Sequence, residues 1–170
     1  MRIIAGTLAG RELTSPTDGR VRPTAEAVRA GMLDLVGPAV AGASVLDLFA
    51  GTGALGLEAL SRGAARADFV EFRPASLHAL KTNVARLKLK PRCRVFNKDA
   101  LRFIEGIPAP YDLAFADPPY ESRVLDRVID HWRGTGFARI LVVEHARSHP
   151  LPPGGKKKAF GETLVTVFRR

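Results

Sequence analysis

The chain alternates between two patterns of apolar residues, and the alternation predicts strands and helices in turn. From residue 44 onward, short apolar runs that favour buried strands are separated by stretches in which apolar residues recur every three or four positions, as in amphipathic helices. Leu125, Val128, Ile129 and Trp132, for example, are spaced at i, i+3, i+4 and i+7. The predicted strands are 44–49, 67–71, 93–97, 113–117 and 140–144. Near-continuous apolar strands that alternate with helices are typical of a parallel sheet covered on both faces.

The two ends of the chain depart from this alternation. Residues 157–160 and 163–168 are separated only by Gly161 and Glu162, so they can pair only as an antiparallel hairpin. Residues 2–16 form a second predicted hairpin, with glycines placed for a turn. We therefore predict an α/β fold: a doubly wound, mostly parallel seven-stranded sheet with an antiparallel C-terminal hairpin and an N-terminal β-hairpin arm. The whole chain, 1–170, is expected to be a single domain, with the arm at 1–22 and the core at 23–170.

The composition suits a globular domain with a polyanionic partner. Of the 170 residues, 46% are hydrophobic and 25% are charged, which is an ordinary balance for a folded domain. The 26 Lys and Arg outnumber the 17 Asp and Glu, and the net charge of +9 favours nucleic acid as the partner. Positive charge gathers in the first thirty residues, between residues 81 and 102, and at 156–158. The alternative for any single cluster is a solvated face without a partner.

The arginines of the first thirty residues are candidates for contacts with RNA phosphates. The predicted arm is too small to carry a core of its own, so it must lean on the main domain or on a partner. Arginines on such an arm can hold phosphates and so position RNA without reading its sequence. The candidate substrate-binding residues in this part of the chain are Arg2, Arg11, Arg22, Arg29 and Thr24, the last of which is also the predicted cap of the next helix.

Several functions are disfavoured by what the sequence lacks. It has no run of eighteen apolar residues, so no membrane-spanning helix is expected. Cys93 is the only cysteine, which rules out a disulfide within the chain and favours a cytoplasmic location. The four histidines show no metal-ligand spacing, and no metal site is predicted. The pair Glu144-His145 follows a strand end, where it can border an RNA site, but the sequence alone does not assign it there.

The segment Asp117-Pro118-Pro119-Tyr120 carries the clearest chemical signal. It follows an apolar strand, and its prolines, which lack an N–H and have a fixed φ, make a rigid lip. The Asp117 carboxylate, a proline carbonyl and the Tyr120 ring then converge on one point. A planar base with an exocyclic amine fits there, because the amine can donate to both oxygens while the base stacks on the tyrosine. The alternative for Tyr120 is a lid packed over a cofactor.

A glycine loop, Gly51-Thr52-Gly53-Ala54-Leu55-Gly56, lies upstream between a predicted strand and a helix. Its G-x-G-x-x-G pattern fits NAD as well as other nucleotides. Asp47, however, stands at the strand end beside the loop, where it would repel a pyrophosphate and attract a cation. S-adenosylmethionine carries a sulfonium and an ammonium but no phosphate, and the glycine amides can bind its carboxylate. The alternative for Asp47 is a carboxylate that orders the loop amides, and both roles can hold together.

Two further acids end successive strands. Glu71 ends the second predicted strand, about twenty residues after the loop, where nucleotide-binding sheets place an acid on the ribose hydroxyls. Asp99 follows the third strand, where it can accept from the adenine amine. Each acid alone fits a loop cap equally well. Three acids at the ends of three successive strands form a more specific pattern.

Together these motifs resemble those of class I S-adenosylmethionine-dependent methyltransferases. The segments at the two ends narrow the resemblance to the RsmD family over nearly the whole chain: Arg2-Ile3-Ile4-Ala5-Gly6, Gly10-Arg11-Glu12-Leu13, Arg22-Pro23-Thr24 and Phe160-Gly161-Glu162-Thr163. That family methylates N2 of one guanine, at position 966, in bacterial 16S ribosomal RNA. The chain departs from the family pattern at Leu33, where an aromatic is usual, and at Arg73, where a second acid often follows the ribose-binding glutamate.

The resemblance implies a Rossmann-like class I methyltransferase and gives a role to each candidate residue. It puts the glycines at the methionine end of the cofactor, Glu71 on the ribose and Asp99 at the adenine. The implied cofactor-binding residues are Asp47, Phe49, Gly51, Gly53, Glu71, Asp99 and Ala100. The implied catalytic residues are Asp117, Pro118 and Tyr120, and Pro119 joins Tyr120 in contacting the substrate. The resemblance further implies a cytoplasmic monomer that acts on 16S rRNA within an assembling small ribosomal subunit.

Three other interpretations compete with this one. DNA amino-methyltransferases for adenine or cytosine also place an acidic or amide residue before Pro-Pro-aromatic, but 170 residues leave little room for a target-recognition domain. A non-catalytic RNA-binding module of the same fold is disfavoured, because the glycine loop and the acids are intact. An NAD-dependent oxidoreductase is disfavoured by Asp47 and by the proline lip.

Overall fold

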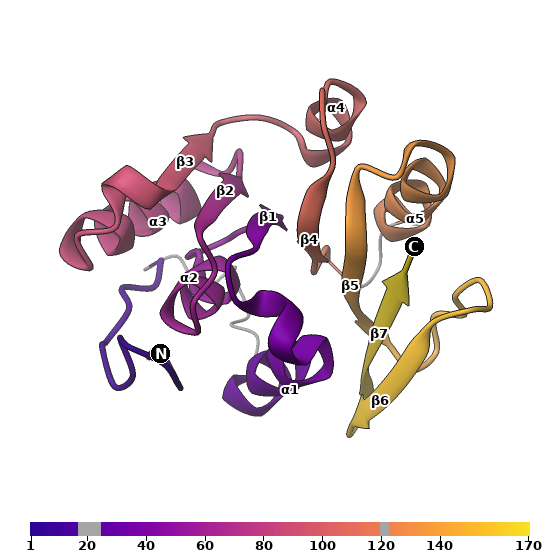
Figure 1. Cartoon of the computed structure of the whole chain (residues 1–170), viewed down its shortest axis with the longest axis horizontal. Helices are drawn as coiled ribbons and strands as arrows, with labels where there is room; N and C mark the ends of the chain where they lie inside the picture. The colour runs from indigo at the N-terminus through magenta and orange to yellow at the C-terminus, as the bar shows by residue number, and fades with distance from the viewer. Residues whose placement is uncertain (17–24, 120–122) are drawn as a thin grey trace.

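The computed structural model of the protein describes residues 1–16, 25–119 and 123–170, and its centre is one seven-stranded sheet (Figure 1). The strands are β1 (Ser44–Leu48), β2 (Arg66–Val70), β3 (Cys93–Phe96), β4 (Tyr111–Ala116), β5 (Ala138–Ala146), β6 (Lys156–Phe160) and β7 (Thr163–Arg169). Their order across the sheet is β3-β2-β1-β4-β5-β7-β6. The first five strands pair in parallel, and β7 is antiparallel to both β5 and β6. The predicted sheet and its C-terminal hairpin are confirmed.

Helices cover both faces of the sheet, as a doubly wound fold requires (Figure 1). The two layers are α1 (Glu26–Val36), α2 (Ala54–Ser61) and α3 (Pro74–Arg86) on one face, and α4 (Ala100–Glu105) and α5 (Val124–Thr135) on the other; short 3-10 turns lie at η1 (Gly37–Val40) and η2 (Lys90–Arg92). Each face of the sheet has its own hydrophobic core, and alternate residues of β4 point into them. Leu113 and Phe115 belong to the core under α1, α2 and α3, and Ala114 and Ala116 to the core under α4 and α5. None of the helices in the described ranges is long and apolar enough to cross a membrane.

The strand ends differ from the prediction by one or two residues, and the difference is informative. β1, β2, β3 and β4 each end one residue earlier than predicted. In β1 the next residue, Phe49, has a φ of 63°, which takes the chain out of the ladder. β5 instead runs two residues further than predicted, to Ala146, because the antiparallel strand β7 pairs with it up to Thr163. Glu71 and Asp117 therefore stand just beyond their strands, at the shared carboxyl edge of the sheet.

The predicted N-terminal β-hairpin is only partly right. Residues 1–3 and 10–13 do pair in antiparallel fashion, with Ile3 N donating to Arg11 O at 2.9 Å and Leu13 N to Met1 O at 2.9 Å. The pairing amounts to one isolated bridge, between Arg2 and Glu12, and no strand forms on either side. The backbone groups of this arm turn instead to the main domain.

The arm is docked on α2 and α3 by hydrogen bonds to buried side chains. The Glu58 carboxylate of α2 accepts from the backbone N–H groups of Ile4 and Ala5 at 2.8 and 2.9 Å. Asn83 of α3 accepts from Thr14 N at 2.7 Å, and it donates to the Thr14 carbonyl and to the Thr52 carbonyl of the glycine loop, both at 3.0 Å. The arm therefore leans on the domain, as its small size predicted, and Asn83 ties it to the loop.

A pair of glycine substitutions tests this docking. Gly6 and Gly10 both have a left-handed φ, +84° and +80°, so an alanine at either position costs about 1–2 kcal/mol of stability. Only at Gly6 would the new Cβ also collide with the main domain, 2.0 Å from the Ser61 carbonyl oxygen, whereas nothing lies within 4 Å of it at Gly10. We expect Gly6→Ala to lower the melting temperature clearly more than Gly10→Ala does and to expose the arm to proteolysis. Equal losses for the two variants would contradict the docked arm.

Candidate active site

Four acids form a row along the carboxyl edge of the sheet. The strand order β3-β2-β1-β4 sets the sequence of the row as Asp99, Glu71, Asp47 and Asp117. Asp47 is the fourth residue of β1, Glu71 and Asp117 directly follow β2 and β4, and Asp99 lies three residues after β3. Because β1 lies between β2 and β4, the middle acids are neighbours. The structure thus brings together acids that lie up to seventy residues apart in the sequence.

The two central acids are buried and hold the glycine loop. Asp47 and Glu71 are each 3% exposed. One Asp47 oxygen, Oδ2, accepts from Gly56 N at 2.9 Å, and Glu71 Oε2 accepts from Gly51 N at 2.9 Å. The suggestion that Asp47 orders the loop amides is therefore confirmed. Both glycine amides that were expected to bind a ligand carboxylate have protein acceptors here, since Gly53 N donates to the Ala50 carbonyl at 2.7 Å, and their role in binding stays a prediction.

The loop glycines are required by backbone conformation and packing. Gly51 and Gly53 have φ values of 56° and 80°, in the left-handed region that glycine favours. A Cβ on Gly53 would stand 2.4 Å from Leu80 Cδ1, and one on Gly56 would stand 2.5 Å from Phe69 Cε1. The pattern therefore lets α2 approach the sheet and α3 closely. Phe49 shares the left-handed conformation without being glycine, and such local strain is often found at functional sites.

The electrostatics of the acid row call for a positive ligand. The pKa of Asp47 is raised to about 7, mainly by burial and further by the neighbouring charges of Asp117 and Glu71, against the hydrogen bond from Gly56 N that lowers it. Buried like charges that repel one another favour a cation placed among them. An anionic pyrophosphate would add to the repulsion.

Glu71 and Asp99 also make local contacts. Glu71 Oε1 accepts from the backbone N–H groups of Phe72 and Arg73 at 2.9 and 2.8 Å, and Arg73 Nε lies 3.4 Å from the same oxygen. Arg73, where the family often has an acid, thus folds back on the glutamate. Asp99 is exposed and caps α4, since its Oδ1 accepts from Arg102 N at 3.1 Å, and Ala100 beside it is buried. The cap suggested for Asp99 is confirmed.

Phe72 is an exposed aromatic residue beside the acid row that sequence reasoning did not single out. It is 57% exposed and is the one large hydrophobic side chain that stands out as exposed in the described part of the chain. It directly follows Glu71, just beyond the end of β2 at the carboxyl edge of the sheet. An aromatic residue immediately after a strand-end acid was the available signal.

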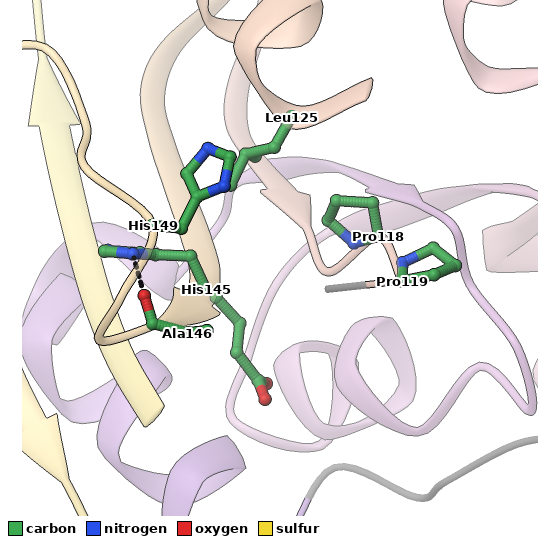
Figure 2. Close-up of a pocket in the computed structure, with 7 residues that line it drawn as sticks. Pro118, Pro119, Leu125, His145, Ala146 and His149 are labelled. Atoms are coloured by element: carbon green, nitrogen blue, oxygen red, sulfur yellow. Dashed lines mark hydrogen bonds between the residues drawn. The ribbon is translucent and has the colours of Figure 1, made fainter. Parts of the chain in front are cut away.

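The proline lip borders a small pocket at the ends of β4 and β5 (Figure 2). Its lining residues are Pro118, Pro119, Leu125, Glu144, His145, Ala146 and His149. His145 is buried, with Nε2 2.9 Å from Thr166 Oγ1, and burial lowers its pKa. His149 Nε2 lies 2.8 Å from Asp126 Oδ1. Asp117 itself is half-buried, and Tyr120 lies outside the described residues.

The predicted arginine contacts are only partly compatible with the structure. Arg29 is fully buried, pairs with Glu58 at 3.8 Å and donates to the Arg2 carbonyl. The prediction that Arg29 contacts RNA is therefore wrong: its guanidinium is a structural group under the arm. Arg2 and Arg11 are exposed, and Arg2 pairs loosely with Glu26 at 3.5 Å. Arg22 and Thr24 lie outside the described residues.

No metal centre is found within the described ranges, because His, Cys, Asp and Glu side chains there form no group of three that could hold an ion. The absence of a metal in the working protein stays a prediction. The described residues that stand along this edge of the sheet are the four acids, with Phe49 after β1 and Phe72 after β2.

Comparison with known proteins agrees with this geometry, and the strand order with the acid row defines the class I methyltransferase fold. The chain belongs to the RsmD family, whose model, described as "Conserved hypothetical protein 95", matches residues 1–168. Ribosomal RNA small subunit methyltransferase D of Escherichia coli is 37% identical over 179 aligned positions, which cover 100% of this chain and 90% of that protein.

Solved structures extend the likeness to three dimensions. The yhhF protein from Escherichia coli, described as a methyltransferase, superposes with a TM-score of 0.87 at 34% identity, over 100% of this chain and 97% of that one. A Thermus thermophilus 16S rRNA N2 G1207 methyltransferase, in complex with AdoMet and guanosine, gives a TM-score of 0.72 over 91% of this chain and 44% of its own. At 22% identity the latter likeness shows the fold alone.

Proposed function

We propose that this protein transfers a methyl group from S-adenosylmethionine to the exocyclic N2 amine of guanine 966 in bacterial 16S ribosomal RNA. The observation that carries the proposal is the row of carboxylates at the sheet edge, two of them buried, next to a rigid Asp-Pro-Pro segment. Membership of the RsmD family and the name of the Escherichia coli relative support rRNA as the substrate. The position and the atom come from the family resemblance.

The residues of the row fit S-adenosylmethionine. When bound, this cofactor supplies a methyl group on a positively charged sulfur. Asp47, whose pKa is raised by burial and by neighbouring acids, gains most from a cation beside it. Glu71 accepts from a ribose hydroxyl with the one lone pair that its three backbone contacts leave on Oε2, Asp99 accepts from the adenine amine, and Phe72 covers the adenine ring.

The Asp-Pro-Pro segment acts on the target amine. The lone pair of a guanine amine is delocalised into the ring, so the nitrogen is a poor nucleophile. Asp117 and the Pro118 carbonyl accept its two N–H groups and draw the nitrogen toward tetrahedral geometry, with its lone pair directed at the methyl. As the N–C bond forms and the S–C bond breaks, positive charge grows on nitrogen, and Asp117 stabilises that charge more than it stabilises the starting amine. The nitrogen then loses a proton to solvent, and Tyr120 holds the base by stacking.

The pH dependence of cofactor binding tests the role of Asp47. With a pKa of about 7, Asp47 is mostly ionised at pH 8 and mostly protonated at pH 6. We expect calorimetry to show S-adenosylmethionine binding weaken by up to about tenfold between pH 8 and pH 6, because the proton competes with the cation. Asp47→Asn should bind weakly at both pH values and lose this dependence. The exposed substitution Asp130→Asn should keep it, and a pH dependence that survives Asp47→Asn would contradict the assignment.

Asp47 also affects stability, and in the opposite direction: as pH rises, cofactor binding becomes stronger but the contribution of Asp47 to stability falls. Between the ordinary aspartate pKa of about 4 and the folded value of about 7, the folded state keeps a proton that the unfolded state has lost. The contribution of Asp47 to the free energy of unfolding therefore falls as pH rises through this window and is level above it. At pH 8 without ligand, we expect Asp47→Asn to be at least as stable as the wild type, although it binds the cofactor worse.

Transfer of label from S-adenosyl-[methyl-³H]methionine tests the function and its alternatives. We expect label in 16S rRNA and none in duplex DNA oligonucleotides, and we expect added NAD not to compete. Label in DNA alone would support a DNA amino-methyltransferase, and RNA binding without transfer would support a non-catalytic module. Comparing naked rRNA with assembling small subunits tests the proposed setting, and light scattering tests the proposed monomer. Action in the cytoplasm, where subunits assemble, is part of the proposal.

A further inference from the structure

A buried carboxylate, Glu144, stands beside Asp117 at the carboxyl edge of the sheet. Ala116 of β4 pairs with Val143 of β5, so the residues that follow them, Asp117 and Glu144, are neighbours in register. The residues two positions earlier on both strands belong to the same core, and side chains two apart on a strand share a face. Both carboxylates therefore leave the sheet toward the same face. Sequence analysis did not assign Glu144 to the site.

Glu144 lies in the pocket that the proline lip borders, and its backbone is held on both sides. It is 5% exposed and lines the pocket with Pro118 and Pro119. β5 is flanked by β4 on one side and by β7 on the other, where Glu144 pairs with Val165. The next residue, His145, is bound to Thr166 across the same pair of strands. A carboxylate on such a rigid element has little freedom to move, as base selection requires.

Base chemistry matches one carboxylate to one ring nitrogen. Guanine presents two neighbouring donors, N1–H and the N2 amine, on its Watson–Crick edge. Adenine and cytosine present a lone pair at the corresponding ring nitrogen, and uracil has no amine beside its N–H. An ionised carboxylate accepts hydrogen bonds and cannot donate them. It therefore favours a base that carries N1–H and disfavours one that carries a lone pair at N1.

We propose that Glu144 specifies guanine, by accepting the N1–H of the base while Asp117 and the Pro118 carbonyl hold its N2 amine. This inference rests on the proposed function, because it concerns the same base at the same lip. In this proposal two neighbouring strands have different roles. Asp117, at the end of β4, acts on the amine, and Glu144, on β5, selects the base.

Replacing one base in the substrate tests the assignment. 2-Aminopurine keeps the N2 amine but carries a lone pair at N1. With a 16S rRNA fragment that contains guanine or 2-aminopurine at the target position, we expect the wild type to prefer guanine at least about 100-fold in kcat/KM. Glu144→Gln puts an amide that can donate in the same place, so it should lower this preference at least about tenfold. 2-Aminopurine also lacks O6, but that loss acts on both enzymes alike and cancels in the comparison.

Each outcome supports or overturns the proposal. Glu105→Gln makes the same chemical change at an exposed position of α4 and should leave the preference unchanged. If Glu144→Gln slows both substrates equally while it still binds S-adenosylmethionine, Glu144 is only structural and the proposal is overturned. If the variant does not fold, the measurement on the wild type alone tests the proposal, because equal kcat/KM for guanine and 2-aminopurine would overturn it. If the wild type methylates neither RNA, the proposed function falls first and takes this assignment with it.

Discussion

Asp117→Ala is expected to lower the rate of methyl transfer to rRNA by about two to four orders of magnitude while the affinity for S-adenosylmethionine changes only a few-fold. The reason is that the proposed mechanism has Asp117 act on the target amine at the end of β4, whereas it assigns the cofactor to acids on β1 and at the ends of β2 and β3. Single-turnover kinetics give the rate, and calorimetry gives the affinity. Asp130→Ala, on the exposed side of α5, is the control and should leave both unchanged.

Asp117→Ala also has a second readout that a purely structural loss would not produce. The charge of Asp117 is one of the causes of the raised pKa of Asp47, so its removal should move that pKa down. The pH at which cofactor binding weakens should therefore shift to a lower value in the variant. Near wild-type turnover in Asp117→Ala would contradict the proposed mechanism. If the pH dependence of cofactor binding did not shift, Asp117 and Asp47 would not be neighbours in solution.

Glu58→Ala is expected to cause the largest loss of stability, about 3–5 kcal/mol in the free energy of unfolding. Glu58 and Arg29 both have fully buried side chains and form an ion pair, and Glu58 also accepts from Arg62 Nε at 3.0 Å and from two backbone N–H groups of the arm. Alanine would leave the Arg29 charge without its carboxylate and the arm without two acceptors. Denaturant unfolding, in parallel with Glu105→Ala as an exposed control, measures the difference.

A second substitution separates the ion pair from the docking of the arm. Arg29→Met removes the buried charge but leaves the Glu58 carboxylate for the arm amides. In the double variant with Glu58→Ala, we expect part of the loss to be recovered, because no uncompensated charge remains. The part of the loss that is not recovered measures the cost of leaving the Ile4 and Ala5 amides without their Glu58 acceptor. If Glu58→Ala were as stable as Glu105→Ala, the arm would not be docked through this residue.

Much of the fold could be predicted because its signals are local. Apolar runs predict the strands, and apolar residues at helical spacing predict the helices. The glycine loop and the proline lip can be recognised from their residue types. The acids Asp47, Glu71 and Asp99 could be grouped from the sequence alone, because the carboxyl ends of parallel strands meet at one edge. Their exact contacts could not be predicted. Asp47 and Glu71 bind the amides of Gly56 and Gly51. The loop needs glycines because a side chain would not fit there and because the backbone is left-handed at Gly51 and Gly53.

The failures concern contacts between distant parts of the chain. Arg29 looks like an RNA contact in a basic stretch, and only the approach of α2, which brings in Glu58, shows it to be buried. The arm looks like a hairpin, yet it forms only one bridge, and its amides at Ile4, Ala5 and Leu8 bind Glu58 and Ser61 of the main domain. Glu144 gives no sign from its neighbours in sequence that it lies beside Asp117, because that placement depends on the register of β4 with β5.

Mapping one methyl group on ribosomal RNA tests the proposed function most directly. Small subunits that lack the modification are incubated with the protein and S-adenosylmethionine, and the 16S rRNA is digested and sequenced by tandem mass spectrometry. We predict one added methyl group, as N2-methylguanosine at position 966, with the wild type and none with Asp117→Ala. No added methyl group with the wild type, or a methyl group on another atom or at another position, would contradict the proposed function.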